Sequence, residues 1–244
     1  FVGLEGAYSQ YLQGVNGKRI EQRIRGGFWM PISDEDQVEP QNGKDVYTSL
    51  NIDFQAVATH ALMKQLDSTK ADHGTVVLME VETGFVKAIA NLSRHSDGSY
   101  GEDMNYAIWE SAEPGSTFKL ASLLAVLEDG KYDTNAVVPT GKAKYGDRVM
   151  VDSHEEGYGN VTLKKAFEVS SNVGISNLVV KAFAGREQVY VDLLRKMGVG
   201  QYLNLEIAGE GVPFLKDPKS RRDPNNKNPW NSTTLPYMSI GYEI

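Results

Sequence analysis

Ser116 and Lys119, three positions apart at the start of a predicted helix, are the residues of this chain best suited to chemistry. At 3.6 residues per turn their side chains lie roughly 60° apart around the axis, so the lysine amine can reach the serine hydroxyl. A serine needs an adjacent base to act as a nucleophile, and lysine serves only when its pKa is lowered. The pair predicts nucleophilic serine chemistry, although Ser-x-x-Lys also arises by chance on solvated helix faces.

A second polar group lies 54 residues downstream of Ser116, as Ser170-Ser171-Asn172. Alone, such a run is more often a helix cap or a turn than a site, and we expect Ser171 to pack or cap. The chain also contains a carboxylate, a hydroxyl and an imidazole in consecutive positions, at Asp152-Ser153-His154. Neighbours in sequence do not make a triad, so we assign that group no catalytic role.

The segments before Ser116 predict a helix and a hairpin. Val46–Leu50 is β-prone, and Asn51 or Asp53 can cap a helix with an apolar stripe that runs from Phe54 to Leu66. Two β-rich runs around the turn at 82–84 indicate a β-hairpin.

The segments around and after Ser116 are mainly helical. Leu120, Leu123, Leu124 and Leu127 follow the serine at helical spacing, and Gly130 ends that run. We expect the first three leucines to keep Lys119 desolvated. Further helices are predicted at 163–182, with an interruption near Asn172, and at 186–197, and the tail at 213–236 is mostly loop. Taken together, these elements give a mixed α/β class.

The first 45 residues are rich in glycine and proline, with one short amphipathic stretch at 4–12 and a polar, linker-like stretch at 33–43. We find neither a signal peptide nor an apolar run long enough to span a membrane. Because the chain starts Phe1-Val2-Gly3 without an initiator Met, we expect it to be a piece of a longer protein.

Composition excludes several classes of function. The chain has 244 residues, 41% of them hydrophobic, and a formal net charge of −7, which argues against nucleic acid or an anionic membrane surface as the main partner. It has no cysteine, so disulfides and thiolate metal sites are excluded. The four histidines are far apart in sequence, and we expect neither a metal nor a cofactor.

The heptad Glu113-Pro114-Gly115-Ser116-Thr117-Phe118-Lys119 resembles the active-site motif of monofunctional, class B penicillin-binding proteins. That family carries Ser-x-x-Lys, Ser-x-Asn and Lys-Thr-Gly motifs, and Ser170-Ser171-Asn172 is similar to the second of them. Glu113 and the Ser-Ser-Asn form resemble division-type members. Similar landmarks occur in order along nearly the whole chain, at 3–17, 43–55, 82–84, 200, 209–211 and 239–242.

The resemblance implies a serine β-lactamase/D,D-transpeptidase-like fold of the α/β (α+β) type, truncated, with a small N-terminal pedestal remnant. Residues 1–45 would be the end of the pedestal domain and a linker, and residues 46–244 would be a transpeptidase domain incomplete at its C-terminus. The family is anchored by an N-terminal membrane helix, absent here, with its domain on the periplasmic or extracytoplasmic face of the cytoplasmic membrane.

The resemblance also implies a role for each matching residue. Ser116 would attack the carbonyl of a D-Ala-D-Ala stem peptide and form an acyl-enzyme, with its backbone N–H as one oxyanion donor. Lys119 would take the serine proton, Ser170 would relay a proton to the leaving amine, and Asn172 would bind the donor peptide backbone. β-Lactams would acylate the same serine. The implied partners are peptidoglycan stem peptides, β-lactams and other cell-wall synthesis or division proteins, without nucleic acid.

The chain departs from the family in one respect, because no Lys-Thr-Gly motif occurs in its 244 residues. We expect that motif beyond Ile244, with a second oxyanion donor and a second lysine, so that the 244-residue piece alone is weakly active or inactive. Two alternatives to a transpeptidase remain open. They are a non-catalytic cell-wall or divisome scaffold, and a relative of β-lactamases or β-lactam sensors.

Overall fold

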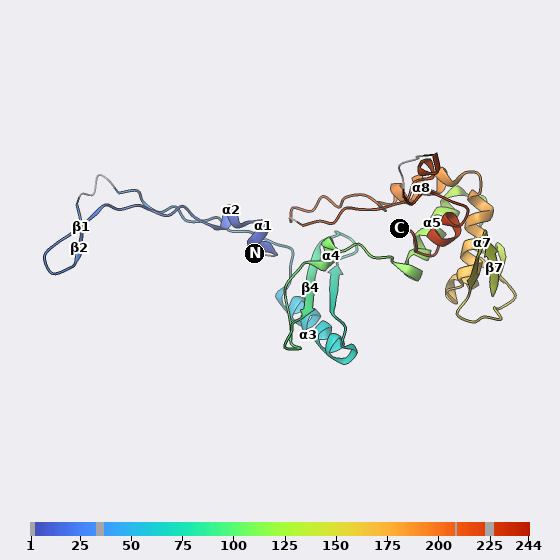
Figure 1. Cartoon of the computed structure of the whole chain (residues 1–244), viewed down its shortest axis with the longest axis horizontal. Helices are drawn as coiled ribbons and strands as arrows, with labels where there is room; N and C mark the ends of the chain where they lie inside the picture. Colours follow the sequence, from blue (N-terminus) through green and yellow to red (C-terminus); the bar gives the residue numbers. More distant parts are fainter. Residues whose placement is uncertain (1–2, 33–36, 208, 223–226) are drawn as a thin grey trace. The chain divides into compact units, whose positions relative to one another are not determined.

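The computed structural model describes residues 3–32, 37–207, 209–222 and 227–244, in two compact units that we describe separately (Figure 1). Unit 1 is Phe1–Glu110 with Asn204–Gly211, and unit 2 is Ser111–Leu203 with Val212–Ile244. These units group residues by contact, whereas the predicted domain limits at residues 45 and 46 follow the family resemblance. Those limits stay a prediction.

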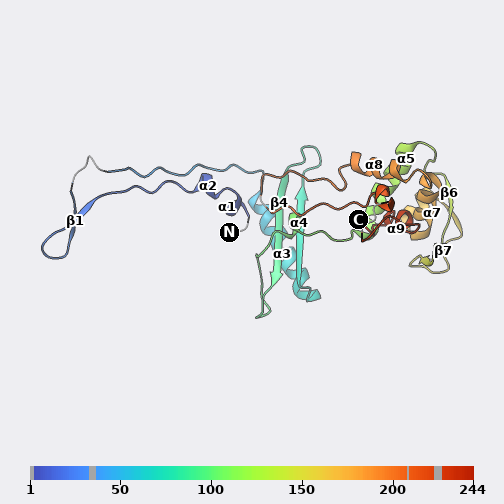
Figure 2. The same ribbon diagram turned by 45° about the horizontal axis from the view of Figure 1, so that its top comes forward.

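The N-terminal part of unit 1 is a narrow two-stranded ribbon (Figure 1, Figure 2). The amphipathic stretch at 4–12 forms two short helices that meet at Tyr8. Isolated bridges join the two sides of the ribbon, and residues 33–36 of the predicted linker lie outside the described residues. Its elements are α1 (Leu4–Ala7), α2 (Ser9–Leu12), β1 (Glu21–Arg23) and β2 (Trp29–Pro31).

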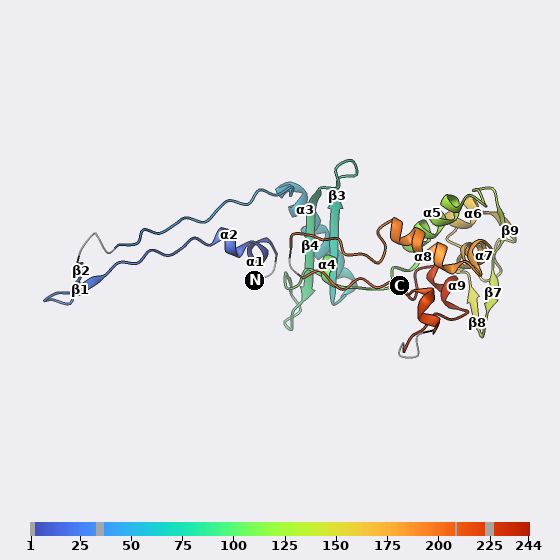
Figure 3. The ribbon, with the colours of Figure 1, turned by 90° about the horizontal axis from the view of Figure 1, so that it is seen from above.

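The core of unit 1 is one helix against one face of a small antiparallel sheet, an arrangement visible in all three ribbon views (Figure 3). Asn51 caps α3 (Ile52–Thr69) by accepting the backbone N–H groups of Asp53 and Phe54, as predicted. The core is formed by buried residues of α3 and β4, namely Ala58, Leu62, Leu66, Ala88, Ala90 and Leu92. Part of the apolar stripe expected on this helix is exposed. Phe54 and Val57 lie at the surface, outside this core.

The predicted hairpin is confirmed as β3 (His73–Met79) and β4 (Val86–Arg94), which pair in the order β3-β4-β5 with β5 (Tyr100–Gly101). A short helix, α4 (Tyr106–Trp109), ends the first segment of this unit. The strand expected at Val46–Leu50 is wrong. That segment contacts β4 through Ser49 Oγ, which donates to Val86 O at 2.8 Å, and it forms no ladder.

Unit 2 is mainly helical (Figure 3). Of its described helices, α7 carries the most buried residues, eight in all. The predicted interruption near Asn172 is confirmed, because Thr162 caps α6 and Ser171 caps α7. Its helices are α5 (Lys119–Asp129), α6 (Leu163–Glu168), α7 (Asn172–Phe183), α8 (Glu187–Lys196) and α9 (Thr234–Met238), with 3-10 turns η1 (Gly115–Phe118) and η2 (Pro218–Arg222). Its strands form two-stranded ladders from β6 (Val137–Pro139) with β9 (Asn160–Thr162), and β7 (Lys142–Tyr145) with β8 (Arg148–Val151).

Candidate active site

Ser116 is exposed at the second residue of η1, immediately before α5. Gly115 has a φ of +57°, a backbone region in which glycine is favoured. The Thr117 hydroxyl donates to Pro114 O at 2.7 Å, and the Phe118 ring is buried. The turn is thus fixed on both sides, while Ser116 itself is exposed.

Lys119 has the opposite environment, since it is only 1% exposed. Its Nζ donates to Ser170 O at 2.6 Å and to Ser170 Oγ at 3.0 Å. Burial lowers the pKa of Lys119 from 10.5 to about 8, and the Asp152 carboxylate opposes that shift by favouring the charged amine. Lys119 and Ser170 are therefore in direct contact, and Ser116 lies one turn earlier on the same helical segment.

Two of the three leucines expected to desolvate Lys119 lie at the surface, whereas Leu123 packs against the core. Leu120 is 52% exposed and Leu124 is 46% exposed. The buried side of α5 is instead formed by Lys119, Ser122, Ala125 and Val126. Lys119 lies on the buried face of its own helix, whereas Leu120 and Leu124 lie on the exposed face.

Ser170 is held in a left-handed conformation with a φ of +54°, which is uncommon for a residue with a side chain. Its N–H donates to Phe167 O at 3.0 Å, and the next N–H, of Ser171, donates to Ala166 O at 2.8 Å. The α6–α7 corner thus turns sharply and presents both oxygens of Ser170 to Lys119. Strained residues of this kind often occur at functional sites.

Asp152, to which the sequence analysis assigns no catalytic role, holds the α6–α7 corner through its carboxylate. Its buried carboxylate accepts the Ser171 hydroxyl at 2.7 Å, the Val173 N–H at 2.9 Å and the Gly141 N–H at 2.7 Å. Ser171 also accepts the Gly174 N–H, so its predicted capping role is confirmed. One feature of the sequence could have indicated a buried role for Asp152. It directly follows the apolar run Val149-Met150-Val151, whose end is expected to be buried.

Asn172 opens α7 two residues beyond Ser170. Its Nδ2 donates to Val151 O at 3.2 Å, which fixes the plane of the amide. His154 makes a tilted ring contact with Tyr158 at 5.0 Å, while the carboxylate of Asp152 is bonded to the α7 corner. The adjoining Asp152, Ser153 and His154 therefore show no triad-like arrangement.

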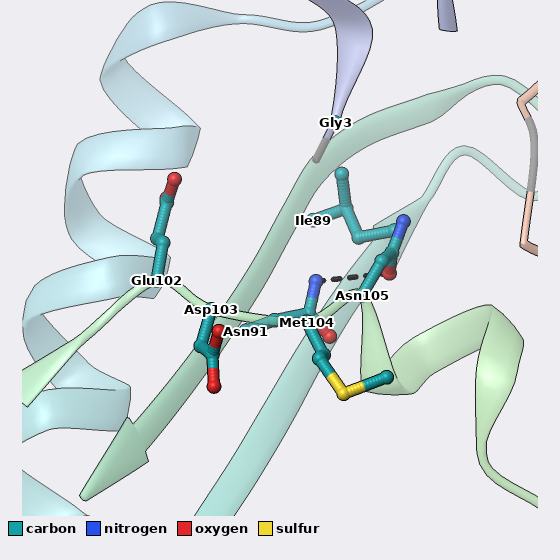
Figure 4. Close-up of a pocket in the computed structure, with 7 residues that line it drawn as sticks. All are labelled: Gly3, Ile89, Asn91, Glu102, Asp103, Met104 and Asn105. Carbon is teal, nitrogen blue, oxygen red and sulfur yellow. Dashed lines mark hydrogen bonds between the residues drawn. The ribbon is translucent and has the colours of Figure 1, made fainter. Parts of the chain in front are cut away.

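A cavity of about 360 Å³ lies elsewhere, in unit 1, lined by Gly3, Ile89, Asn91, Glu102, Asp103, Met104 and Asn105 (Figure 4). Its amides are bonded to the protein, since Asn91 Nδ2 donates to Asn105 Oδ1 at 3.0 Å and Asn91 Oδ1 accepts the Ala107 N–H. None of the predicted catalytic residues lines this cavity. Within the described ranges, no three potential ligand side chains of His, Asp or Glu gather in a way that could hold a metal ion.

Comparison with known proteins identifies the family. Residues 74–233, about two thirds of the chain, match the family described as the penicillin binding protein transpeptidase domain. The chain belongs to this family. The match includes the Ser-x-x-Lys and Ser-x-Asn segments, and the predicted family is confirmed.

Two curated relatives of this transpeptidase domain are similar over 99% of the chain. The probable peptidoglycan D,D-transpeptidase PenA of Neisseria gonorrhoeae is 30% identical over 248 residues, and the chain covers 40% of it. The peptidoglycan D,D-transpeptidase FtsI of Escherichia coli strain K12 is 30% identical over 247 residues, with 39% of that protein covered. The chain thus spans about 40% of the length of these relatives.

Solved structures confirm the fold class of this transpeptidase domain. A peptidoglycan synthetase from Bifidobacterium adolescentis has a TM-score of 0.74 at 23% identity, over 99% of this chain and 42% of the other. A structure of a peptidoglycan synthase complex has a TM-score of 0.77 at 24% identity, over 98% of this chain and 45% of the other. Among the described residues, no helix is both long and apolar enough to cross a membrane.

Proposed function

We propose that the whole protein is a peptidoglycan D,D-transpeptidase that cross-links stem peptides through an acyl-enzyme on Ser116. The observation that carries the proposal is the buried Lys119 amine, which contacts Ser170 and has a pKa lowered to about 8. An amine with that pKa is neutral often enough at physiological pH to accept a proton. An ordinary solvated lysine is not.

Acylation uses the side chains of Lys119, Ser116 and Ser170. Neutral Lys119 takes the proton of the Ser116 hydroxyl, and Oγ attacks the carbonyl carbon of the penultimate D-Ala of a donor stem. The tetrahedral intermediate then loses its C–N bond. Ser170 gives its proton to the departing D-Ala amine and regains one from the Lys119 ammonium, along the contact of 3.0 Å between Nζ and Oγ. Lys119 ends neutral, and Ser116 carries the acyl group.

Two further groups bind the substrate. The backbone N–H of Ser116 donates to the developing oxyanion, a contribution whose loss typically costs about 10² to 10³ in rate. The Asn172 amide, fixed through its Nδ2 by Val151 O, accepts the backbone N–H of the donor stem at its Oδ1. An acceptor amine from a second stem then attacks the ester carbonyl, which forms the new amide bond and breaks the bond to Ser116 Oγ. The proton lost by the amine passes through Ser170 and Lys119 to Oγ and restores the hydroxyl.

The setting of this reaction follows from the family. We propose a division-type, membrane-anchored protein on the outer face of the cytoplasmic membrane, with other cell-wall synthesis or division proteins as partners. Residues 1–45 would then be the end of a pedestal and residues 46–244 part of the transpeptidase domain. The relatives are named peptidoglycan D,D-transpeptidases, and the chain covers about 40% of their length, so they have room for further domains. β-Lactams would be taken as mimics of D-Ala-D-Ala.

Labelling the whole protein with a fluorescent penicillin tests the proposal. We expect one label per chain, no label in Ser116→Ala, and at least a 10³-fold slower reaction in Lys119→Ala. Ser153→Ala is the matched control, because Ser153 is an exposed serine of the same unit. An unlabelled wild-type protein would favour the scaffold alternative, and rapid loss of the label by hydrolysis would favour a β-lactamase relative.

A further inference from the structure

A short C-terminal segment lies directly behind the turn that carries Ser116. The Gly115 N–H donates to Gly241 O at 3.1 Å, and the Glu243 N–H donates to Glu113 Oε1 at 3.0 Å. A Cβ on Gly241 would come within 2.1 Å of Gly115 O, and the φ of Gly241 is +87°. The two backbones are thus in contact with no room for a side chain, so a shift in one moves the other.

A buried ion pair holds this segment in place. The Glu243 carboxylate accepts Lys216 Nζ at 2.8 Å, and the Lys216 side chain is only 2% exposed. Lys216 Nζ also donates to Asn228 Oδ1 at 2.9 Å, and Arg148 lies 3.8 Å from the other Glu243 oxygen. Glu243 itself has a φ of +60°, uncommon for a residue with a side chain. Its carboxylate and its backbone N–H are both engaged, which fixes that conformation.

A buried ion pair is weak evidence for net stability, because desolvation of the two charges offsets their attraction. Its best-supported role is to specify one arrangement of the chain around it. We propose that Lys216 and Glu243 are positioning residues for acylation, which hold the Glu113–Gly115 backbone and so aim the Ser116 hydroxyl. This inference rests on the proposed function. A nucleophile displaced by about 1 Å can cost on the order of 10² in rate.

The pair is separate from the groups that tune the base. Lys119 and Ser170 are held through the α6–α7 corner by Asp152, whereas Lys216 and Glu243 hold the turn before Ser116. Loss of the pair should therefore slow acylation without moving the pH at which Lys119 titrates. A general loss of structure would change both.

The test measures acylation of the whole protein by benzylpenicillin in Lys216→Met, with Lys142→Met as the matched control. Lys142 pairs with Glu155, but both side chains are exposed, at 58% and 74%. We expect Lys216→Met to acylate about 10- to 100-fold more slowly with an unchanged midpoint of the pH profile, and Lys142→Met to stay within about twofold of wild type. Lys216→Arg, which keeps the charge, should recover part of the rate.

Hydrogen exchange of the Gly115 amide gives a second readout that does not need activity. We expect this amide, bonded to Gly241 O, to exchange faster in Lys216→Met than in wild type. A folded Lys216→Met protein with wild-type rate and exchange would overturn the inference. If that variant does not fold, Glu243→Gln, which keeps the shape but not the charge, is judged by the same two measurements.

Failure of the proposed function looks different from failure of this inference. A wild-type protein that does not react with penicillin would reject the transpeptidase. Exchange at Gly115 would then still decide whether the ion pair holds the turn.

Discussion

Lys119 combines burial with two hydrogen bonds to a single residue, and its protonation is the chemical centre of the site. With a pKa of about 8, about a tenth of the amines are neutral at pH 7, against well under one in a thousand for an ordinary lysine. This difference in the neutral fraction is large enough for Lys119 to act as a base where an ordinary lysine would not.

Asp152→Asn should change both the base and the fold. Asp152 raises the pKa of Lys119 through its charge, so removing the charge lowers that pKa further and moves the pH midpoint of acylation to lower pH. The new amide also brings a donor to a carboxylate position surrounded by donors, which we expect to destabilise the protein by about 2 to 4 kcal/mol. The measurements are the acylation pH profile and urea unfolding.

Glu155→Gln is the control for that variant, because Glu155 is an exposed acid three residues later. We expect it to leave both measurements unchanged. A midpoint that moves to higher pH in Asp152→Asn would contradict the electrostatic part of this account.

At the residue scale, the sequence predicts the pair Ser116 and Lys119 because their spacing is local to one helical turn. It does not predict Asp152 or Lys216, because their partners are distant in sequence. Asp152 bonds to residues 11, 19 and 21 positions away, and Lys216 to a carboxylate 27 positions away. Contacts of this kind depend on the chain fold rather than on a motif.

The α6–α7 corner is the element on which the site depends, and Ser171→Ala tests it. Ser171 Oγ both caps α7 at Gly174 and donates to Asp152. We expect its loss to lower the free energy of unfolding by about 1 to 3 kcal/mol, measured by urea unfolding. Ser153→Ala should have little effect, since Ser153 is exposed. Equal stabilities for the two variants would argue that the corner is held by other contacts.

The sequence predicts an element correctly when neighbouring residues define it, as in a helix cap or a hairpin turn. It fails where the element depends on a segment that is distant in sequence. The Asn51 cap and the hairpin turn at 82–84 depend on neighbouring residues, and both helix and hairpin form as expected. Val46–Leu50 has β-prone side chains and contacts β4 through the Ser49 hydroxyl, but it forms no ladder with that strand. The exposed Leu120 and Leu124 show the same limit, because helical spacing reveals an apolar face but not which face is buried.

At the scale of the molecule, Ser116, Lys119, Ser170 and Asn172 all belong to unit 2. A Lys-Thr-Gly motif does not occur in these 244 residues. We therefore expect the 244-residue chain, produced alone, to react with a fluorescent penicillin at least about 10²-fold more slowly than the whole protein, the cost of one missing oxyanion donor. Equal rates would mean that the third motif is dispensable for acylation.

The pH dependence of acylation is the sharpest test of Lys119 as the base. The second-order rate constant for benzylpenicillin at Ser116 is measured in the whole protein from pH 6 to 10, with the uncatalysed hydrolysis of the β-lactam subtracted. Because the neutral amine is the base, we predict a rate that rises about tenfold per pH unit at low pH and levels off above a midpoint near pH 8. A flat profile, or a midpoint close to the ordinary lysine value of 10.5, would contradict Lys119 as the base.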